Sequence, residues 1–139
     1  MGGAAYDDSY LYFFSKVFDK ADSVSAVTIS LDPQNKHYTA PGAGIYKLNL
    51  SADDKLQTYE GSNDNWITGK LKGVKTKIRK VNDGYFAEIA IPWVAIGGKP
   101  ALNKRIGLNM ALTTSTGYTE NISSNEADKP FTWCTLKLY

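Results

Sequence analysis

The chain has 139 residues, 42% of them hydrophobic and 22% charged, and its 16 Lys and Arg against 14 Asp and Glu leave a formal net charge of +2. This length and composition suit one globular domain and exclude disordered and fibrous chains. The longest apolar runs, such as Leu11–Phe14, are far shorter than the roughly 20 residues of a membrane helix, so no membrane span is expected. The small net charge does not commit the chain to an acidic partner.

The first residues and the cysteine count limit the context of the domain. Residues 1–5 contain neither the basic nor the apolar region of a secretory signal, so we expect them to be a leader and residues 6–139 to form the domain. Cys134 is the only cysteine of the chain, which excludes an intrachain disulfide and a thiolate metal cluster.

Apolar and polar residues alternate with period 2 along much of the chain, which predicts an all-β fold of antiparallel sheets. The first expected strand is Tyr10–Phe18. The clearest is Val27–Leu31, whose apolar residues alternate with Thr28 and Ser30 and which ends at the turn Asp32–Asn35. The later expected strands are 45–50, 73–81, 84–91, 105–114 and 132–139.

The turns between these runs organise them into a sandwich. Asn82-Asp83-Gly84 joins two predicted strands and is a strong hairpin signal. Pro92 precedes a short helical turn expected at Trp93–Ile96, which Gly97-Gly98 would end. Frequent turns between seven strands predict an antiparallel β-sandwich of jelly-roll type.

Several of these segments resemble a known family. Asp8–Phe14 is similar to a "D-x-Y-L-Y" strand, and Ala26–Pro33 to a "V-E-I-F-L-D-P" strand and turn. Asp83–Trp93 resembles "G-Y-x-x-E-x-A-I-P-W" and is followed at a suitable distance by Ile106–Asn109. These motifs belong to the family 9 carbohydrate-binding modules, which are β-sandwiches attached to xylanases and other secreted polysaccharide-active enzymes. The resemblance runs from Tyr6 to Tyr139, so the family's opening strand would lie before Met1 and be missing.

The family's sugar-binding positions are mostly changed in this chain. The first clamp Trp of the family corresponds to Asp22, its Glu to Thr28, its Arg to Lys47 and its Gln to Ala111, whereas Asn109 keeps the family's Asn. No aromatic residue occupies the second clamp position, in the loop 123–128.

Other residues offer the chemistry that a glycan site needs, because sugars stack on aromatic rings and bond to polar side chains. Trp66 lies in a polar segment expected to be a loop and is the main candidate platform, against the alternative of a loop anchor. The pattern leaves the face of Trp133 open, whereas Trp93 is expected to be structural. Tyr38, Tyr59 and Tyr118 lie in or beside expected loops and are further candidate contacts, with capping of the core as the alternative for each. The predicted carbohydrate-binding residues are Trp66, Lys47, Asn109, Thr28, Tyr118, Tyr38 and Trp133.

The resemblance also suggests structural calcium, which takes hard oxygen ligands such as carboxylates. The metal candidates are Asp7, Asp8 and Asp64, with Asp53, Asp54 and Asp128 as further acidic residues and with a solvated surface acid as the alternative for each. Related sandwich domains bind haem through a Met and a basic ligand, for which Met110 with His37 or a lysine would be needed, but no haem is expected.

The basic residues of 69–81 are interpreted as the solvated side of a strand, so no nucleic acid partner is expected, although an acidic glycan could still meet them. No catalytic motif accompanies His37, the only histidine, so we expect no enzyme activity.

The resemblance therefore implies a non-catalytic, extracellular or cell-surface carbohydrate-binding module. It would target a covalently linked catalytic or surface domain to plant cell-wall polysaccharide, either xylan or β-glucan. The alternative is a sandwich module that has lost sugar binding and acts as a structural or protein-contact domain.

Overall fold

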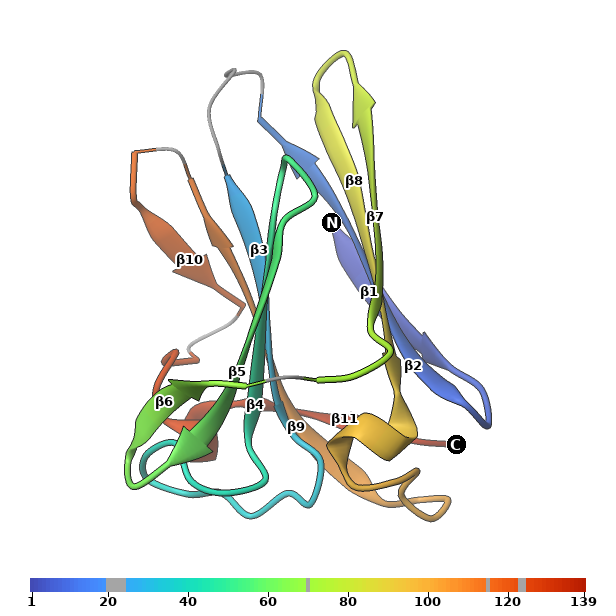
Figure 1. Ribbon diagram of the computed structural model, residues 1–139, viewed down its shortest axis with the longest axis vertical. Coiled ribbons are helices and arrows are strands. Elements are labelled where there is room, and N and C mark those ends of the chain that lie inside the picture. The colour runs from blue at the N-terminus through green and yellow to red at the C-terminus, as the bar shows by residue number, and fades with distance from the viewer. Residues whose placement is uncertain (20–24, 70, 115, 123–124) are drawn as a thin grey trace.

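The computed structural model describes residues 1–19, 25–69, 71–114, 116–122 and 125–139. Within these ranges the chain forms two antiparallel sheets that face each other as a sandwich (Figure 1). The predicted all-β sandwich is confirmed. Among the described residues, no helix is long and apolar enough to cross a membrane.

The smaller sheet has four strands. Its order is β1 (Gly2–Tyr6), β2 (Tyr10–Phe18), β8 (Gly84–Pro92) and β7 (Lys75–Val81), so that β2 and β8 occupy its centre. All nine residues of β2 pair with β8, from Tyr10 opposite Pro92 to Phe18 opposite Gly84. This long register fixes which side chains of both strands face the other sheet.

The larger sheet has seven strands in the described residues. Its order is β10 (Thr119–Asn121), β9 (Arg105–Thr113), β3 (Ala26–Asp32), β4 (Tyr46–Ser51), β5 (Leu56–Ser62) and β6 (Asn65–Thr68), and β11 (Cys134–Lys137) also pairs with β9. Two short 3-10 helices, η1 (Trp93–Ile96) and η2 (Pro130–Thr132), lie outside the sheets.

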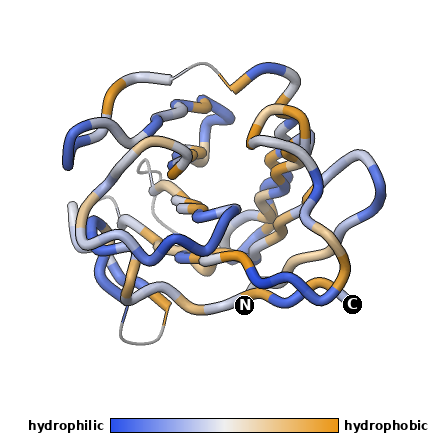
Figure 2. Tube along the Cα trace, turned by 90° about the horizontal axis from the view of Figure 1, so that it is seen from below, coloured by the Kyte–Doolittle hydropathy of each residue, from blue (hydrophilic) through white to orange (hydrophobic). Residues whose placement is uncertain are grey.

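The core lies between the sheets and follows the period-2 pattern of the sequence. Leu11, Phe13 and Val17 of β2 are buried against Val27 and Ile29 of β3 and their neighbours in one continuous cluster. In Figure 2 hydrophobic and hydrophilic residues alternate over short distances along the tube, as expected for strands with one buried side.

Trp93 closes one end of this core, as the sequence predicts. It is buried in η1, its indole Nε1 donates a hydrogen bond to the Asp7 carbonyl oxygen at 2.9 Å, and its ring meets the Tyr6 ring edge-on at 6.4 Å. Gly97 ends η1 in the left-handed region with φ of 96°. The 3-10 turn thus ties the end of β8 to the link between β1 and β2.

Four strands are additional to the seven predicted ones. Residues 2–6, expected as a leader, form β1, which pairs with β2 from Gly2 opposite Ser15 to Tyr6 opposite Leu11. The Gly- and Ala-rich sequence of β1 has little intrinsic strand preference. Its strand conformation therefore depends on pairing with β2. The others are β5, β6 and β10.

We predict that Gly84→Ala strongly destabilises the fold. Gly84 opens β8 with φ of 152°, and an added Cβ would lie 1.9 Å from the Val17 carbonyl oxygen of β2. We expect the free energy of unfolding to fall by about 3 kcal/mol, measured by urea unfolding. Gly97→Ala is the control, because Gly97 also has a positive φ but no atom within 4 Å of an added Cβ. Its cost is backbone strain alone, about 1 kcal/mol, and an equal cost at both positions would contradict this interpretation.

Candidate functional site

The outer face of the larger sheet is set by the direction of the β3 side chains. Val27, Ile29 and Leu31 belong to the core, so Thr28 and Ser30 point to the outside. The same parity extends across the sheet through the strand register, which makes polar residues of neighbouring strands share this face.

One row of that face runs from β3 to β5. Lys47 of β4 lies opposite Ser30 and opposite Tyr59 of β5. Tyr59 in turn lies opposite Thr68 of β6, two residues after Trp66. The twist and pairing of three strands therefore bring Lys47, Tyr59 and Trp66 to one place.

These residues form a compact group with Asp128, which we call the Trp66 cluster. The Lys47 Nζ atom lies 4.4 Å from the centroid of the Trp66 ring and 4.9 Å from that of Tyr59. The Trp66 Nε1 donates a hydrogen bond to Asp128 Oδ1 at 2.7 Å. The indole is thus held by a cation on its face and a carboxylate at its edge, which fixes the orientation of the ring.

Burial also changes the charge chemistry of Lys47. Removal of its ammonium from water lowers the pKa of Lys47, and the nearby Asp128 carboxylate partly opposes that shift. The cluster therefore combines a partly buried aromatic ring, a cation and an anion. This combination can stack on the C–H face of a sugar and bond to its hydroxyl groups.

An open hollow adjoins the turn that precedes β6. It has a volume of about 340 Å³ and is lined by Tyr38 and its following loop on one side and by Ser62, Asn63 and Asp64 on the other. Asn63 and Asp64 have positive φ values of 47° and 64°, which is the geometry of a tight hairpin turn between β5 and β6. The sequence predicted a loop around Trp66, but the residue lies in strand β6, directly after this turn.

A neighbouring part of the same face is covered by the chain itself. Asn109 of β9 is only 1% exposed, and its amide donates to Asn121 Oδ1 at 2.8 Å and accepts from Asn125 Nδ2 at 3.2 Å. Trp133 is 4% exposed, and its Nε1 donates to the Glu126 carbonyl oxygen at 2.9 Å. Asn125 therefore ties the segment 125–133 to β9 through Asn109, the Trp133 bond closes that segment on itself, and neither Asn109 nor Trp133 faces solvent.

The remaining predicted sugar residues are spread over the face. Thr28 lies outward but accepts a hydrogen bond from Asn49 Nδ2 at 2.9 Å. Tyr118 is 66% exposed beside the tip of the β9–β10 hairpin, at the opposite end of the sheet from β6 (Figure 1). The structure thus unites Lys47 with Trp66, and places Tyr38 at the adjoining hollow. The predicted clamp position Asp22 and residues 123–124 of the second clamp loop lie outside the described residues, as does Lys70 of the basic run.

The predicted metal ligands are engaged with other groups or lie apart. The Asp7 carboxylate accepts hydrogen bonds from the Tyr12 hydroxyl and from the backbone amides of Ser9 and Tyr10, which lower the pKa of Asp7. Asp8 pairs with Lys99 at 2.7 Å. In the part of the chain that the structure describes, no three His, Cys, Asp or Glu residues are placed to hold a metal ion.

A different acidic residue has an unpartnered oxygen. Asp32 is 1% exposed at the end of β3, and its Oδ2 accepts from the His37 backbone amide at 2.9 Å. Its Oδ1 and the Oδ1 of Asn35, in the same turn, are buried without a hydrogen-bond partner among the described residues. Buried oxygens of this kind are normally satisfied by a water or a cation.

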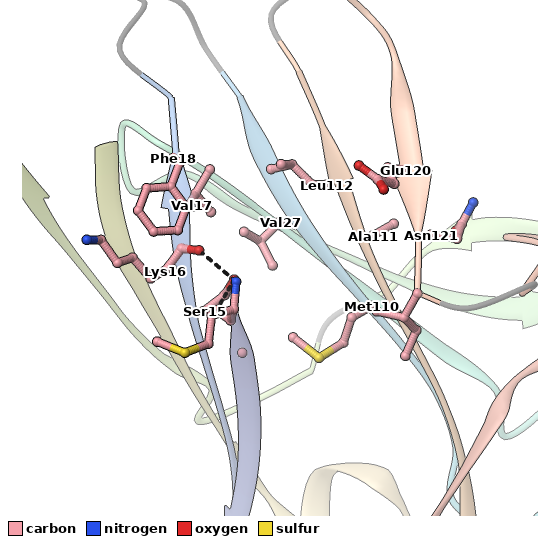
Figure 3. Close-up of a pocket in the computed structure, with 13 residues that line it drawn as sticks. Ser15, Lys16, Val17, Phe18, Val27, Met110, Ala111, Leu112, Glu120 and Asn121 are labelled. Atoms are coloured by element: carbon pink, nitrogen blue, oxygen red, sulfur yellow. Dashed lines mark hydrogen bonds between the residues drawn. The ribbon is translucent and has the colours of Figure 1, made fainter. Parts of the chain in front are cut away.

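Another hollow lies between the two sheets and not on the outer face. It has a volume of about 620 Å³ and opens between β2 and β9, where Val27 and Met110 point toward it (Figure 3). The Lys16 amino group points away from it and pairs with Asp83 at 3.2 Å. Its described lining includes no histidine, and His37 follows the far end of β3. Met110 therefore faces an apolar space without an imidazole opposite it.

Two members of the Trp66 cluster have contacts that sequence reasoning did not find. Tyr59 was expected as a candidate contact in or beside a loop, but it lies in β5, which was not predicted as a strand, so its place beside Lys47 was not visible. Asp128 was considered only as an acidic metal candidate, and its contact with Trp66 joins residues 62 positions apart. A period-2 pattern specifies the outward face of a strand but not which loop returns to it.

Comparisons with known proteins agree with this architecture. The sequence profile described as "Carbohydrate family 9 binding domain-like" matches residues 3–135. A comparison with curated proteins finds no match.

Two solved structures of a family 9 carbohydrate-binding module from Caldicellulosiruptor kristjanssonii have a similar fold. The complex with glucose aligns over 99% of this chain and 75% of its own at 18% identity and a TM-score of 0.74. The complex with cellotriose aligns over 97% and 72%, also at 18% identity, with a TM-score of 0.72. Since the family profile spans nearly the whole sequence, this chain belongs to the family 9 carbohydrate-binding-domain-like family.

Proposed function

We propose that this chain is a non-catalytic carbohydrate-binding module that recognises plant cell-wall glycan, either β-glucan or xylan, through the Trp66 cluster. The observation behind this proposal is the indole of Trp66, which is partly exposed and is oriented by Lys47 and Asp128. A ring held in one orientation before the ligand arrives loses little conformational entropy on binding. The fixed ring therefore suits the stacking of a sugar.

The polar groups around the ring match the hydroxyl groups of a sugar. Lys47 can donate to a hydroxyl oxygen, and Asp128 can accept from a hydroxyl hydrogen beside the indole edge. The hollow beside Tyr38, Asn63 and Asp64 offers further aromatic and polar contacts within reach of the same sheet edge. The relatives of similar fold were solved with glucose and cellotriose, which supports a glucan chain as the ligand.

Binding of this kind serves the rest of a larger protein. A module attached to a polysaccharide-degrading enzyme or a surface assembly raises the effective concentration of that partner at an insoluble chain without performing chemistry. Because plant cell-wall glycan lies outside cells, we place the protein in an extracellular or cell-surface setting.

The second candidate function is a structural or protein-contact module that has lost sugar binding. One observation favours it: the segment with Trp133 covers the outer face of β9, where Asn109 is buried.

Affinity electrophoresis separates the two functions. Retardation by gels containing xylan or mixed-linkage β-glucan supports the binding module, and uniform mobility in every gel supports the structural one.

We predict that Trp66→Ala weakens the binding of cello-oligosaccharides or xylo-oligosaccharides about tenfold, because the stacking surface is removed. Isothermal titration calorimetry measures the effect, and thermal melting checks that the variant is folded. Tyr139→Ala is the control, since it removes an exposed aromatic residue that is not among the predicted sugar contacts. Unchanged affinity of Trp66→Ala, or an equal loss with Tyr139→Ala, would show that the site lies elsewhere.

We also propose a structural calcium ion, at the turn Asp32–Asn35. The buried Asp32 Oδ1 and Asn35 Oδ1 are hard oxygen ligands that receive no hydrogen bond from the described part of the chain, whereas Asp7 and Asp8 already accept bonds from other residues. We expect calcium to raise the melting temperature by about 4 °C relative to a chelator.

Asp32→Asn is predicted to abolish this calcium response, and Asp64→Asn, in an exposed turn, to retain it. The measurement is differential scanning fluorimetry with calcium and with EGTA. Equal melting temperatures of the wild type in both solutions would exclude calcium at this turn and assign the two oxygens to water.

A further inference from the structure

The outer face of the four-stranded sheet has no part in the Trp66 cluster. Leu11 and Phe13 of β2 are buried in the core, so the alternate residues Tyr12 and Phe14 point outward. The register continues these positions across the sheet in two rows. Tyr12 lies opposite Ala90 of β8, which lies opposite Lys75 of β7, and Phe14, Glu88 and Lys77 form the next row.

A groove follows these two rows. It has a volume of about 510 Å³, with Tyr12 and Phe14 on one side and Lys75 and Lys77 on the other. In the first row the small side chain of Ala90 lies between the two sides and leaves the middle of the sheet low. In the second row the exposed Glu88 lies between Phe14 and Lys77 and also lines the groove.

The rings along β2 are held open to solvent. Phe14 is 48% exposed, and its ring lies over Gly3 of β1. The ring is so close that a Cβ added to Gly3 would lie 2.5 Å from the Phe14 Cζ atom. The Tyr12 hydroxyl donates to Asp7 Oδ2 at 2.7 Å, which fixes its ring beside that of Tyr10 at a centroid distance of 5.8 Å. Monomeric proteins seldom leave several ordered aromatic rings on one open sheet face without a use for them.

The opposite side of the groove is basic. Lys75, Lys77 and Arg79 project from the edge strand β7 and, among the described residues, none of them has a carboxylate within ion-pair distance. Lys75 and Arg79 instead lie over the rings of Tyr10 and Phe86, at 5.0 and 4.7 Å from their centroids. Glu88 is the acidic residue of these two rows and lies opposite Lys77, so the three cations exceed it in charge and lie next to aromatic rings that are at least partly exposed.

We propose that this groove is a second, separate binding surface that takes a uronate-bearing polysaccharide chain. The C–H faces of the sugar rings stack on Tyr12 and Phe14, and the uronate carboxylates bond to Lys75 and Lys77. The choice of a glycan over an acidic protein rests on the proposed function, whereas the position and the charge preference rest on this face alone. A chain lying along β8 would meet both rows at once.

The test uses polygalacturonate as the anionic glycan and carboxyl-reduced polygalacturonate as its uncharged counterpart, with polyglutamate as a polyanion without sugar rings. We expect the wild type to bind polygalacturonate most tightly. Lys75→Met/Lys77→Met should weaken this binding about tenfold, as loss of two charge-assisted contacts predicts. Lys55→Met/Lys104→Met is the matched control, because it changes the net charge equally on other surfaces and should leave affinity within about twofold.

Ala90→Tyr is a second variant, which tests the groove by filling it and removes no side chain. It fills the groove with a residue that strands favour, so the fold is retained while polygalacturonate binding falls. Trp66→Ala should leave polygalacturonate binding unchanged while it weakens the binding of neutral oligosaccharides.

Several outcomes would overturn the second surface: no binding of polygalacturonate, an equal loss in the control pair, equally tight binding of polyglutamate, or self-association that Ala90→Tyr abolishes. Loss of both ligands in Trp66→Ala would assign them to one site and also overturn it. Retained polygalacturonate binding with no neutral glycan binding would instead contradict the proposed function of the Trp66 cluster.

Discussion

The alternation of side chains along the paired strands β3–β9 and β2–β8 is the constraint on which the rest of the structure depends. With Ile29 and Ile89 in the core, every second residue of these strands is forced outward. A slip of one residue would exchange the two sides, so the register is strongly specified. The outer faces, and with them Lys47 on one sheet and Lys75 on the other, are therefore consequences of how the core is packed.

The two outer faces differ because, within the described ranges, another segment of the chain packs against the face of the larger sheet but not against that of the smaller one. On the larger sheet, Asn125 holds the segment before β11 against β9, and Asp128 of the same segment reaches Trp66. The segment that buries part of this face also completes the cluster beside it. On the smaller sheet no such contact to Tyr12 or Lys75 is found in the described residues, so its rings and cations stay open.

The sequence predicted strands where apolar residues alternate regularly, as in Tyr10–Phe18, whose bounds agree with β2. It did not predict β5, because Leu56–Ser62 mixes polar residues with glycine and contains no valine or isoleucine. The strand register puts Asn109 on the outer face opposite Ser30, but its burial depends on a segment that folds back from beyond β10. Local pattern specifies the side of a strand, whereas long-range return of a loop decides whether that side meets solvent.

The three tryptophans illustrate how the acceptor of an indole hydrogen bond separates structural from functional roles. Trp93 and Trp133 donate to backbone carbonyl oxygens and are buried, so their bonds satisfy groups that have no access to water. Trp66 donates instead to the exposed carboxylate of Asp128 and is only partly buried. The second oxygen of an exposed carboxylate can accept a hydrogen bond from a sugar hydroxyl while Oδ1 keeps its bond to the indole. Of the three indoles, that of Trp66 is therefore the one whose hydrogen-bond partner can also bond to a ligand.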